Sequence, residues 1–195
     1  MLLSQDEARF PMVPTLTATL GVKGRRPVVG TRDCKHLLYA LAVVNLVSAA
    51  VHANLVDSPK DATAKTGKGK TRRLQEAFAA HLRHVGRMYP AGQCPRVVLL
   101  IDNAPWHAGA PVRAALAENP HLELKRLPSY SPQLNPIERF WKVLRRRATH
   151  NRLFDTLADL RRSLRNSLSY FQTMRDRVRT LLNRRSRKQT PSTGL

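Results

Sequence analysis

The sequence is short of acidic residues, and this shortage restricts what the protein can bind. Only 13 Asp and Glu residues stand against 34 Lys and Arg, so the formal net charge is +21 over 195 residues. So large an excess of one sign indicates a polyanionic partner, and nucleic acid is favoured. Charge alone does not separate a DNA enzyme from a ribosomal, histone-like or membrane-surface protein. An acidic membrane is disfavoured, since no apolar helix face rich in Trp and Phe accompanies the basic residues.

Cysteine is also scarce. Cys34 and Cys94 lie far apart in the chain, and neither belongs to a CxxC motif. This excludes a zinc finger or ribbon and argues against a disulfide framework, so a reducing cytosol is expected. A secretory signal is not expected either, because Asp6 and Glu7 follow the first Met without a preceding basic segment. We therefore expect a cytoplasmic protein, associated with the nucleoid if its partner is DNA.

Long apolar runs are missing as well. The segment from residue 37 to 56 is apolar enough to suggest a membrane span, but Asn45, Ser48, His52 and Asn54 interrupt it. Two buried strands over residues 36–44 and 49–56, paired antiparallel, explain the pattern better. We expect no membrane partner.

The remaining pattern predicts alternating strands and helices, which is typical of an α/β or mixed-sheet domain. The predicted elements are a short strand ending at Asp6 and Glu7, a Pro- and Gly-rich connection over 11–35 with one short hairpin around 22–24, a basic loop over 58–73, a helix over 71–88, a strand over 96–101, a helix over 112–118, a strand over 122–127, a helix beginning at 135–138, and one or two arginine-rich helices over 154–182. Helical spacing predicts that the first long helix buries Leu74, Phe78, Leu82 and Val85, and that the last ones bury Leu157, Leu160, Leu164, Leu168 and Phe171. We divide the chain into a domain over 1–152, a basic helical extension over 153–182 and a disordered tail over 183–195.

Three acidic residues stand where chemistry is expected. Asp6 and Asp102 each follow a predicted strand, and Glu138 lies in the first turn of a predicted helix. Such carboxylates can form the oxygen cage that hard divalent cations such as Mg²⁺ require. Each also has a structural explanation. Glu138 fits a capping box with Asn135 as the N-cap, and Asp102 fits a turn ahead of Pro105.

The surroundings of these acids carry a family resemblance. LLIDNAPWH, from Leu99 to His107, and LPSYSPQLNPIERFWK, from Leu127 to Lys142, resemble the second and third catalytic motifs of the mariner superfamily of transposases, in its bacterial insertion-sequence branch. SQDEARF, at residues 4–10, resembles the first motif. Thirty-five residues lie between Asp102 and Glu138, within the short spacing of that superfamily. The resemblance covers roughly residues 1–155.

This resemblance implies an RNase H-like fold, with a five-stranded mixed sheet flanked by helices. Asp6 would bridge two Mg²⁺ or Mn²⁺ ions, while Asp102 and Glu138 would each hold one. Glu7 should not join them, because adjacent strand residues point to opposite faces. The implied activity is cleavage at transposon ends, followed by attack of the freed 3′-hydroxyl on target DNA. Two other functions stay open: an inactive relic that binds nucleic acid, and an RNase H-like nuclease acting on RNA or branched DNA.

The resemblance also implies partners. Transposases process two ends, so a homodimer is expected in the active assembly. Family members normally carry a helix-turn-helix region ahead of the first catalytic strand. We therefore expect either a truncated copy or a separate or frameshift-fused helix-turn-helix polypeptide.

Residues around the acids are expected to help hold DNA. Asn103 and His107 are more often supporting or DNA-contacting residues than metal ligands, and no His-Glu-x-x-His spacing argues for zinc. Arginines at this density can bind phosphates, although such residues are commonly just solvated helix faces. The candidates are Arg72, Arg73, Arg145 and Arg146. The P-loop-like end at residues 69–71 is rejected, because Ala64 stands where that motif requires glycine.

Overall fold

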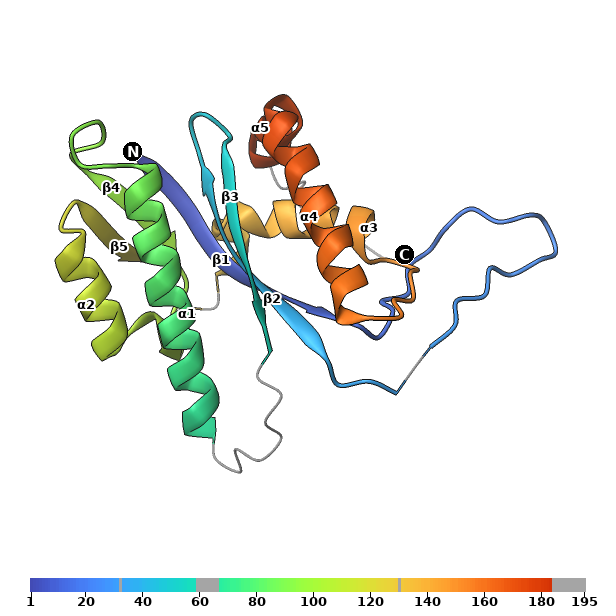
Figure 1. Ribbon diagram of the computed structural model, residues 1–195. Coiled ribbons are helices and arrows are strands. Elements are labelled where there is room, and N and C mark those ends of the chain that lie inside the picture. Colours follow the sequence, from blue (N-terminus) through green and yellow to red (C-terminus); the bar gives the residue numbers. More distant parts are fainter. Residues whose placement is uncertain (32, 59–66, 130, 184–195) are drawn as a thin grey trace, which may run out of the picture.

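The protein forms a five-stranded mixed sheet with helices on both faces, as predicted (Figure 1). This computed structural model describes residues 1–31, 33–58, 67–129 and 131–183. The strands are β1 (Leu2–Pro11), β2 (Leu37–Asn45), β3 (Val51–Asp57), β4 (Val97–Ile101) and β5 (Leu122–Arg126). Their order is β3-β2-β1-β4-β5. The first three strands pair antiparallel, whereas β4 lies parallel to both β1 and β5.

Strand β1 is longer than predicted. It pairs with β2 from Leu3 through Pro11, so Asp6 lies in the middle of a central strand, opposite Ala42, and not at a strand end. The reason is visible in the sequence, because the alternation of faces continues past the acids. Ala8 and Phe10 are buried on the same face as Asp6, while the exposed Arg9 falls on the other alternate position. The two carboxylates interrupt the apolar pattern but not the strand.

Helices cover the two faces of the sheet in two groups. The first group is α1 (Gly67–Met88) and α2 (Ala110–Glu118), and the second is α3 (Ile137–Ala148), α4 (Leu157–Thr173) and α5 (Arg175–Asn183). Single turns of 3₁₀ helix, η1 (Pro105–His107) and η2 (Pro132–Leu134), precede α2 and α3. Helix α1 buries Leu74, Phe78, Leu82 and Val85, as predicted. It begins earlier than expected, within the segment predicted as a basic loop, of which residues 59–66 lie outside the described part.

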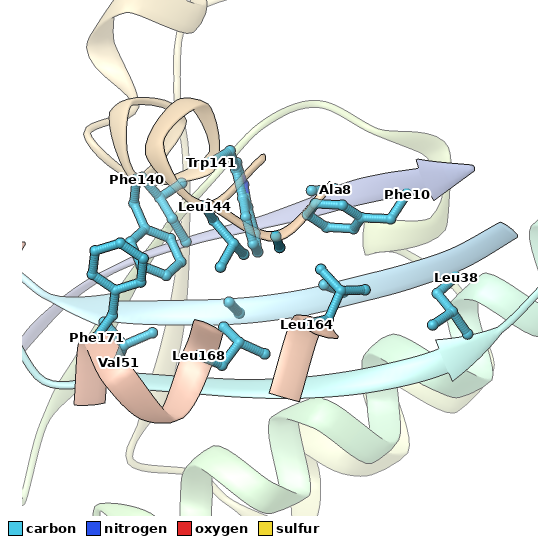
Figure 2. Packing of buried hydrophobic residues seen from close by; sticks show 14 of the residues in the cluster. Ala8, Phe10, Leu38, Val51, Phe140, Trp141, Leu144, Leu164, Leu168 and Phe171 are labelled. Atoms are coloured by element: carbon cyan, nitrogen blue, oxygen red, sulfur yellow. The ribbon is translucent and has the colours of Figure 1, made fainter. Parts of the chain in front are cut away.

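The core under α3, α4 and α5 is rich in aromatic rings (Figure 2). Trp141 and Phe140 of α3 pack against each other, and Phe140 meets Phe171 of α4 edge to face with ring centroids 5.3 Å apart. Leu164 and Leu168 of α4 pack in the same cluster as strands β1 and β2. The helices predicted as an extension therefore contribute to the main core. The boundary at residue 152 stays a prediction, and the predicted tail lies outside the described residues from 184 onward.

The connection between β1 and β2 is largely exposed. A turn forms where Arg25 N–H donates to the Val22 carbonyl at 3.0 Å. No strand pair flanks this turn in the part of the connection that the structure describes, so the predicted hairpin is wrong. Across the described helices, none is both long and apolar enough to cross a membrane.

Candidate active site

A pocket of about 550 Å³ opens where the pairing between β1 and β4 ends. The parallel ladder between these strands covers only Leu2 to Ser4 of β1. Beyond Ser4, β1 no longer pairs on this side, and the pocket lies next to this stretch. Its lining includes all three acidic residues singled out in the sequence, Asp6, Asp102 and Glu138. The fold thus brings together side chains from the beginning, middle and later part of the chain.

Asp6 is the most buried of the three acids, with 8% of the residue exposed. Its Oδ2 accepts a hydrogen bond from the Trp141 indole N–H of α3 at 2.9 Å. Burial, together with the nearby carboxylates of Glu7, Glu138 and Asp102, raises the pKa of Asp6 to about 7. This crowding of negative charge would be relieved by a bound cation.

Asp102 directly follows β4, and its side chain is 53% exposed. Its Oδ1 accepts from the Ala104 N–H at 2.9 Å and lies 3.1 Å from His107 Nδ1. The hydrogen bond from His107 holds the pKa of Asp102 below its usual value, so this group stays ionised. The turn suggested by the sequence is therefore present, and the same turn aims the carboxylate at the pocket.

Glu138 lies in the first turn of α3, but the expected capping box is not formed. The helix begins after Pro136 and has no side-chain cap. Asn135 instead bonds to strand β1: its amide N–H donates to the Gln5 carbonyl at 3.2 Å, and its side-chain oxygen accepts from the Ser4 hydroxyl. The Ser4 hydroxyl in turn accepts from the Ile137 N–H at 3.2 Å. Strand β1 thus caps α3, and Glu138 is not engaged as a capping residue.

The chemistry of these donors fits a hard divalent cation. Carboxylate oxygens are the ligands that Mg²⁺ and Mn²⁺ prefer, and Asp6, Asp102 and Glu138 supply them to the lining of one pocket. Within the described ranges, however, no three His, Cys, Asp or Glu side chains are already close enough to form a metal cluster. The tight cage expected from the sequence is therefore not assembled in this conformation, and the carboxylates would have to draw together around an ion.

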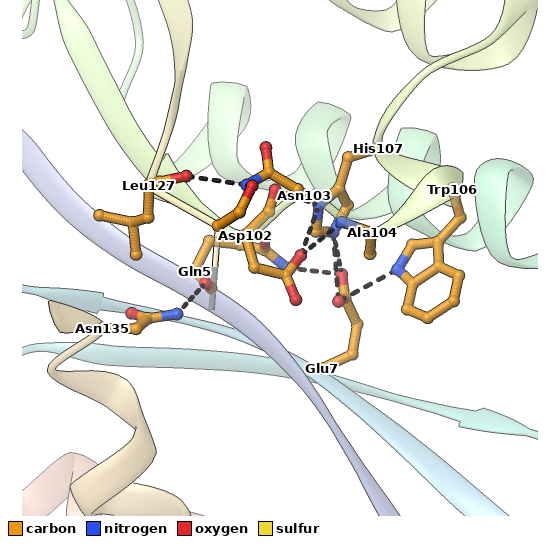
Figure 3. A network of polar contacts seen from close by, with 10 residues as sticks. Gln5, Glu7, Asp102, Asn103, Ala104, Trp106, His107, Leu127 and Asn135 are labelled. Atoms are coloured by element: carbon orange, nitrogen blue, oxygen red, sulfur yellow. Dashed lines mark hydrogen bonds and ion pairs between the residues drawn. The ribbon is translucent and has the colours of Figure 1, made fainter. Parts of the chain in front are cut away.

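Glu7 lies on the opposite face of β1 from Asp6, as strand alternation predicted, and is the centre of a buried network (Figure 3). Only 4% of its side chain is exposed. It accepts from Gln5 Nε2 at 2.8 Å and from Trp106 Nε1 at 3.2 Å, and it lies 2.9 Å from His107 Nε2. This second carboxylate is therefore linked to the pocket through His107.

His107 joins the first and second sequence motifs. Its ring lies between Glu7 and Asp102, and its side chain is 0% exposed. Burial alone would lower the pKa of His107, but the hydrogen bonds to Asp102 and Glu7 outweigh burial and raise it to about 9. The charged imidazole fixes the orientation of Asp102. A direct contact between His107 and DNA, which we expected, does not fit this burial.

The other predicted DNA contacts are dispersed. Asn103 is exposed, lines the pocket and donates to the Leu127 carbonyl at 2.8 Å, so it fastens the loop after β5. The four predicted arginines do not form one cluster, because α1 and α3 cover opposite faces of the sheet. Arg72 pairs with Glu76 on α1, Arg145 lies over the Phe10 ring at 5.4 Å, and Arg73 and Arg146 are exposed.

Sequence reasoning missed the side chains that hold the three acids in place. These are Ser4, Glu7, Asn135 and Trp141. The period-two alternation of β1 did predict that Glu7 faces the other side, and it could also have indicated that this buried carboxylate needs a partner such as His107. Nothing local indicated that Asn135 bonds to β1.

Comparisons with known proteins identify a family for this chain. A family model described as DDE superfamily endonuclease matches residues 1–161. The uncharacterized protein y4pE/y4sA of Sinorhizobium fredii is 35% identical over 85 residues, which are 44% of this chain and 58% of that protein.

Solved structures of the Mos1 mariner transposase share the fold. The Mos1 paired end complex with Mg matches with a TM-score of 0.60 and 18% identity, over 93% of this chain and 53% of that chain. The catalytic domain of Mos1 matches with a TM-score of 0.55 and 18% identity, over 93% of this chain and 78% of that chain. The matched part of this chain spans little more than half the length of the Sinorhizobium fredii protein. Because the family model covers most of the chain and the three acids line one pocket, the protein belongs to the DDE superfamily of endonucleases.

Proposed function

We propose that this chain is the catalytic domain of a DNA transposase, which cleaves DNA at transposon ends and joins the freed 3′-hydroxyl to target DNA. The observation that carries the proposal is the convergence of Asp6, Asp102 and Glu138 on one pocket in a member of the DDE superfamily. Support also comes from two solved structures that share the fold, the Mos1 mariner paired end complexes with Mn and with Mg.

Asp6, Asp102 and Glu138 would hold the two Mg²⁺ or Mn²⁺ ions. Bound ions of this kind activate an attacking oxygen and stabilise the leaving oxygen during in-line phosphoryl transfer. The chain's own contribution is to position the ligands. Trp141 orients Asp6 by its hydrogen bond, and His107 with the Ala104 N–H orients Asp102. The bonds of Asn135 and Ser4 fix the start of α3, and with it Glu138.

The same proposal names the partners and the setting. Two transposon ends require two active sites, so the active assembly is a homodimer on DNA. Recognition of the ends is assigned to a helix-turn-helix polypeptide, either separate or fused by frameshifting. The protein belongs to a bacterial insertion sequence and acts on the nucleoid in the cytoplasm.

The test is strand transfer by the purified full chain. Precut duplexes carrying the element's own terminal repeats are incubated with a supercoiled plasmid and either Mg²⁺ or Mn²⁺, and joined products are counted. Glu138→Gln and Asp102→Asn should each lower the yield by roughly 100-fold or more, since a neutral amide is a poor ligand for a hard cation. Glu123→Gln is the matched control, because this carboxyl on β5 is paired with Arg96 outside the pocket. Wild-type yield from Glu138→Gln with Mg²⁺ would refute the assignment.

A non-enzymatic relic that only binds nucleic acid is the second candidate. It is favoured by the strong positive charge, which suits nucleic-acid binding whether or not the chain is active. This candidate predicts DNA binding without plasmid nicking in Mg²⁺ or Mn²⁺, whether or not the three acids are intact.

A further inference from the structure

A second cavity, of about 650 Å³, lies between α3, α4 and α5 and is lined by four arginines. These are Arg146, Arg147, Arg152 and Arg177, and we call the cavity the arginine pocket. We propose that the arginine pocket binds the phosphodiester backbone of DNA. This contact is separate from the pocket lined by Asp6, Asp102 and Glu138, which we call the acidic pocket. The inference rests on the proposed function in that it names a second surface for the same DNA partner.

No described carboxylate pairs with the arginines of the arginine pocket. Among the described residues that line it, none is acidic. The nearest acid in sequence, Asp176, is already paired with Arg179 at 2.6 Å. Four like charges around one cavity repel each other, and an anion between them removes this cost. A guanidinium group presents two parallel N–H donors, which match the geometry of a phosphate.

Tyr170 gives the arginine pocket a rigid wall. The guanidinium carbon of Arg147 lies 3.7 Å from the centre of the Tyr170 ring, and that of Arg177 lies 5.7 Å from it. Tyr170 in turn packs edge to face on Phe171, which is buried in the core. Arginines stacked on a fixed ring lose less conformational freedom when they bind a phosphate than free surface arginines would. This ordering distinguishes the site from an ordinary solvated helix face.

Helix α3 connects the arginine pocket to the acidic pocket. Glu138 lies in its first turn and Arg147 in its last, about 13 Å further along the axis at 1.5 Å per residue. A contact at the far end of α3 is therefore outside the reaction site but in fixed relation to it. The arginine pocket should affect how tightly DNA binds, and not the chemical step.

The experiment measures binding of a fluorescently labelled 30-base-pair duplex by the full chain in EDTA, by anisotropy over a series of salt concentrations. The test variant carries Arg152→Gln with Arg177→Gln. The control carries Arg87→Gln with Arg113→Gln, which removes the same charge from exposed positions on α1 and α2. The test variant should bind about 10-fold more weakly and lower the salt slope by about 2, while the control changes affinity by less than about 2-fold. Equal weakening in both variants would show that binding follows total charge, and would overturn the proposal.

Two further measurements protect the conclusion. Thr180→Glu places a carboxylate at the rim of the arginine pocket without removing any arginine, and should weaken binding as the test variant does. Unchanged binding by Thr180→Glu would count against the site. Competition with polyglutamate examines an acidic protein as the ligand. If polyglutamate displaces the duplex as well as unlabelled DNA at equal charge, the assignment to phosphodiester is wrong.

The outcome is independent of the strand-transfer test. If the arginine variants lose DNA binding while no cleavage is found under any condition, the arginine pocket stands and the transposase proposal fails. If cleavage depends on Glu138 but the arginine variants bind like the control, the transposase proposal stands and the arginine pocket fails.

Discussion

A single buried carboxyl, Asp6, makes the metal-free protein sensitive to pH. Its pKa is raised from 3.8 to about 7, mainly by burial. Between pH 3.8 and about 7, the folded chain therefore keeps a proton on Asp6 that the unfolded chain has released. The stability that this proton contributes is fully present below pH 3.8 and is lost as pH rises through about 7. The penalty at pH 8 is at most about 4 kcal/mol, at 1.36 kcal/mol for each pKa unit.

Replacing Asp6 should therefore stabilise the metal-free protein at high pH. Asp6→Asn removes the charge and can still accept the Trp141 hydrogen bond, so we expect it to be about 2 kcal/mol more stable than wild type at pH 8 and no more stable at pH 4. Urea unfolding in EDTA at both values measures this, with the exposed Asp33→Asn as control. Excess Mg²⁺ should remove the difference by stabilising only the wild type. If the stability of the wild type to urea were the same at pH 4 and pH 8, the assigned pKa of Asp6 would be contradicted.

Glu7 and His107 form a buried charged pair whose members depend on each other. Removing one partner leaves the other buried without compensation, so Glu7→Gln and His107→Gln should each cost about 3 kcal/mol at pH 7, where His107 is charged. The double variant should cost less than the sum, with a coupling of about 1–3 kcal/mol. Denaturant titrations of the four proteins give this value. The exposed pair Arg83 and Glu118 is the matched control, with a coupling below about 1 kcal/mol; additivity at Glu7 and His107 would refute the network.

At the scale of elements, the start of α3 is held by β1. Asn135→Ala removes the amide that donates to the Gln5 carbonyl and the oxygen that accepts from the Ser4 hydroxyl, so two buried hydrogen bonds are lost. We expect a loss of about 1–3 kcal/mol in stability and a fall in strand transfer beyond what the unfolded fraction explains, because Glu138 loses its fixed place. Thermal melts and the strand-transfer assay, run below the melting range, separate the two effects.

Asn119→Ala serves as the control for this prediction. The Asn119 amide also bonds to a backbone carbonyl, that of Ala115, but at the end of α2 away from the pocket. This variant should lose stability without a separate loss of activity. A drop in activity of the same size as that of Asn135→Ala would mean that both act only through stability.

The elements themselves were largely predictable, because hydrophobic spacing is local. The apolar positions of α1, the antiparallel strands over residues 36–56 and the strand ahead of Asp102 all lie as the pattern indicates. The errors arise where distant residues decide. Strand β1 continues through Asp6 because β2 and α3 cover it, and Asn135 does not cap α3 because β1 offers it better partners. The three acids were singled out by their positions in the predicted elements and by motif resemblance, and the structure places them in the lining of one pocket. The residues that orient them depend on the folded structure.

For the molecule as a whole, the C-terminal helices belong to the core. Helix α4 alone buries Leu160, Leu164, Leu168 and Phe171 against the sheet. Each such side chain contributes about 1.5–3 kcal/mol, so the four together contribute about 6–12 kcal/mol, which is comparable to the typical net stability of about 5–15 kcal/mol.

A chain cut after residue 152 should therefore fail to fold cooperatively, whereas one cut after residue 183 should melt like the full chain. Near-ultraviolet circular dichroism and thermal melts compare the two. A cooperative transition from the shorter chain would show that the boundary at residue 152 is a true domain limit.

The placement of the three acids on separate elements has a consequence for chains that have not finished folding. Each carboxylate belongs to a different part of the chain, so a nascent or partly unfolded molecule that lacks α3 keeps a net positive charge but does not bring Glu138 into the pocket that Asp6 lines. On the proposed function, such a molecule would lack the complete set of carboxylates that holds the cations. The proposed nuclease activity would then be restricted to chains that have completed folding.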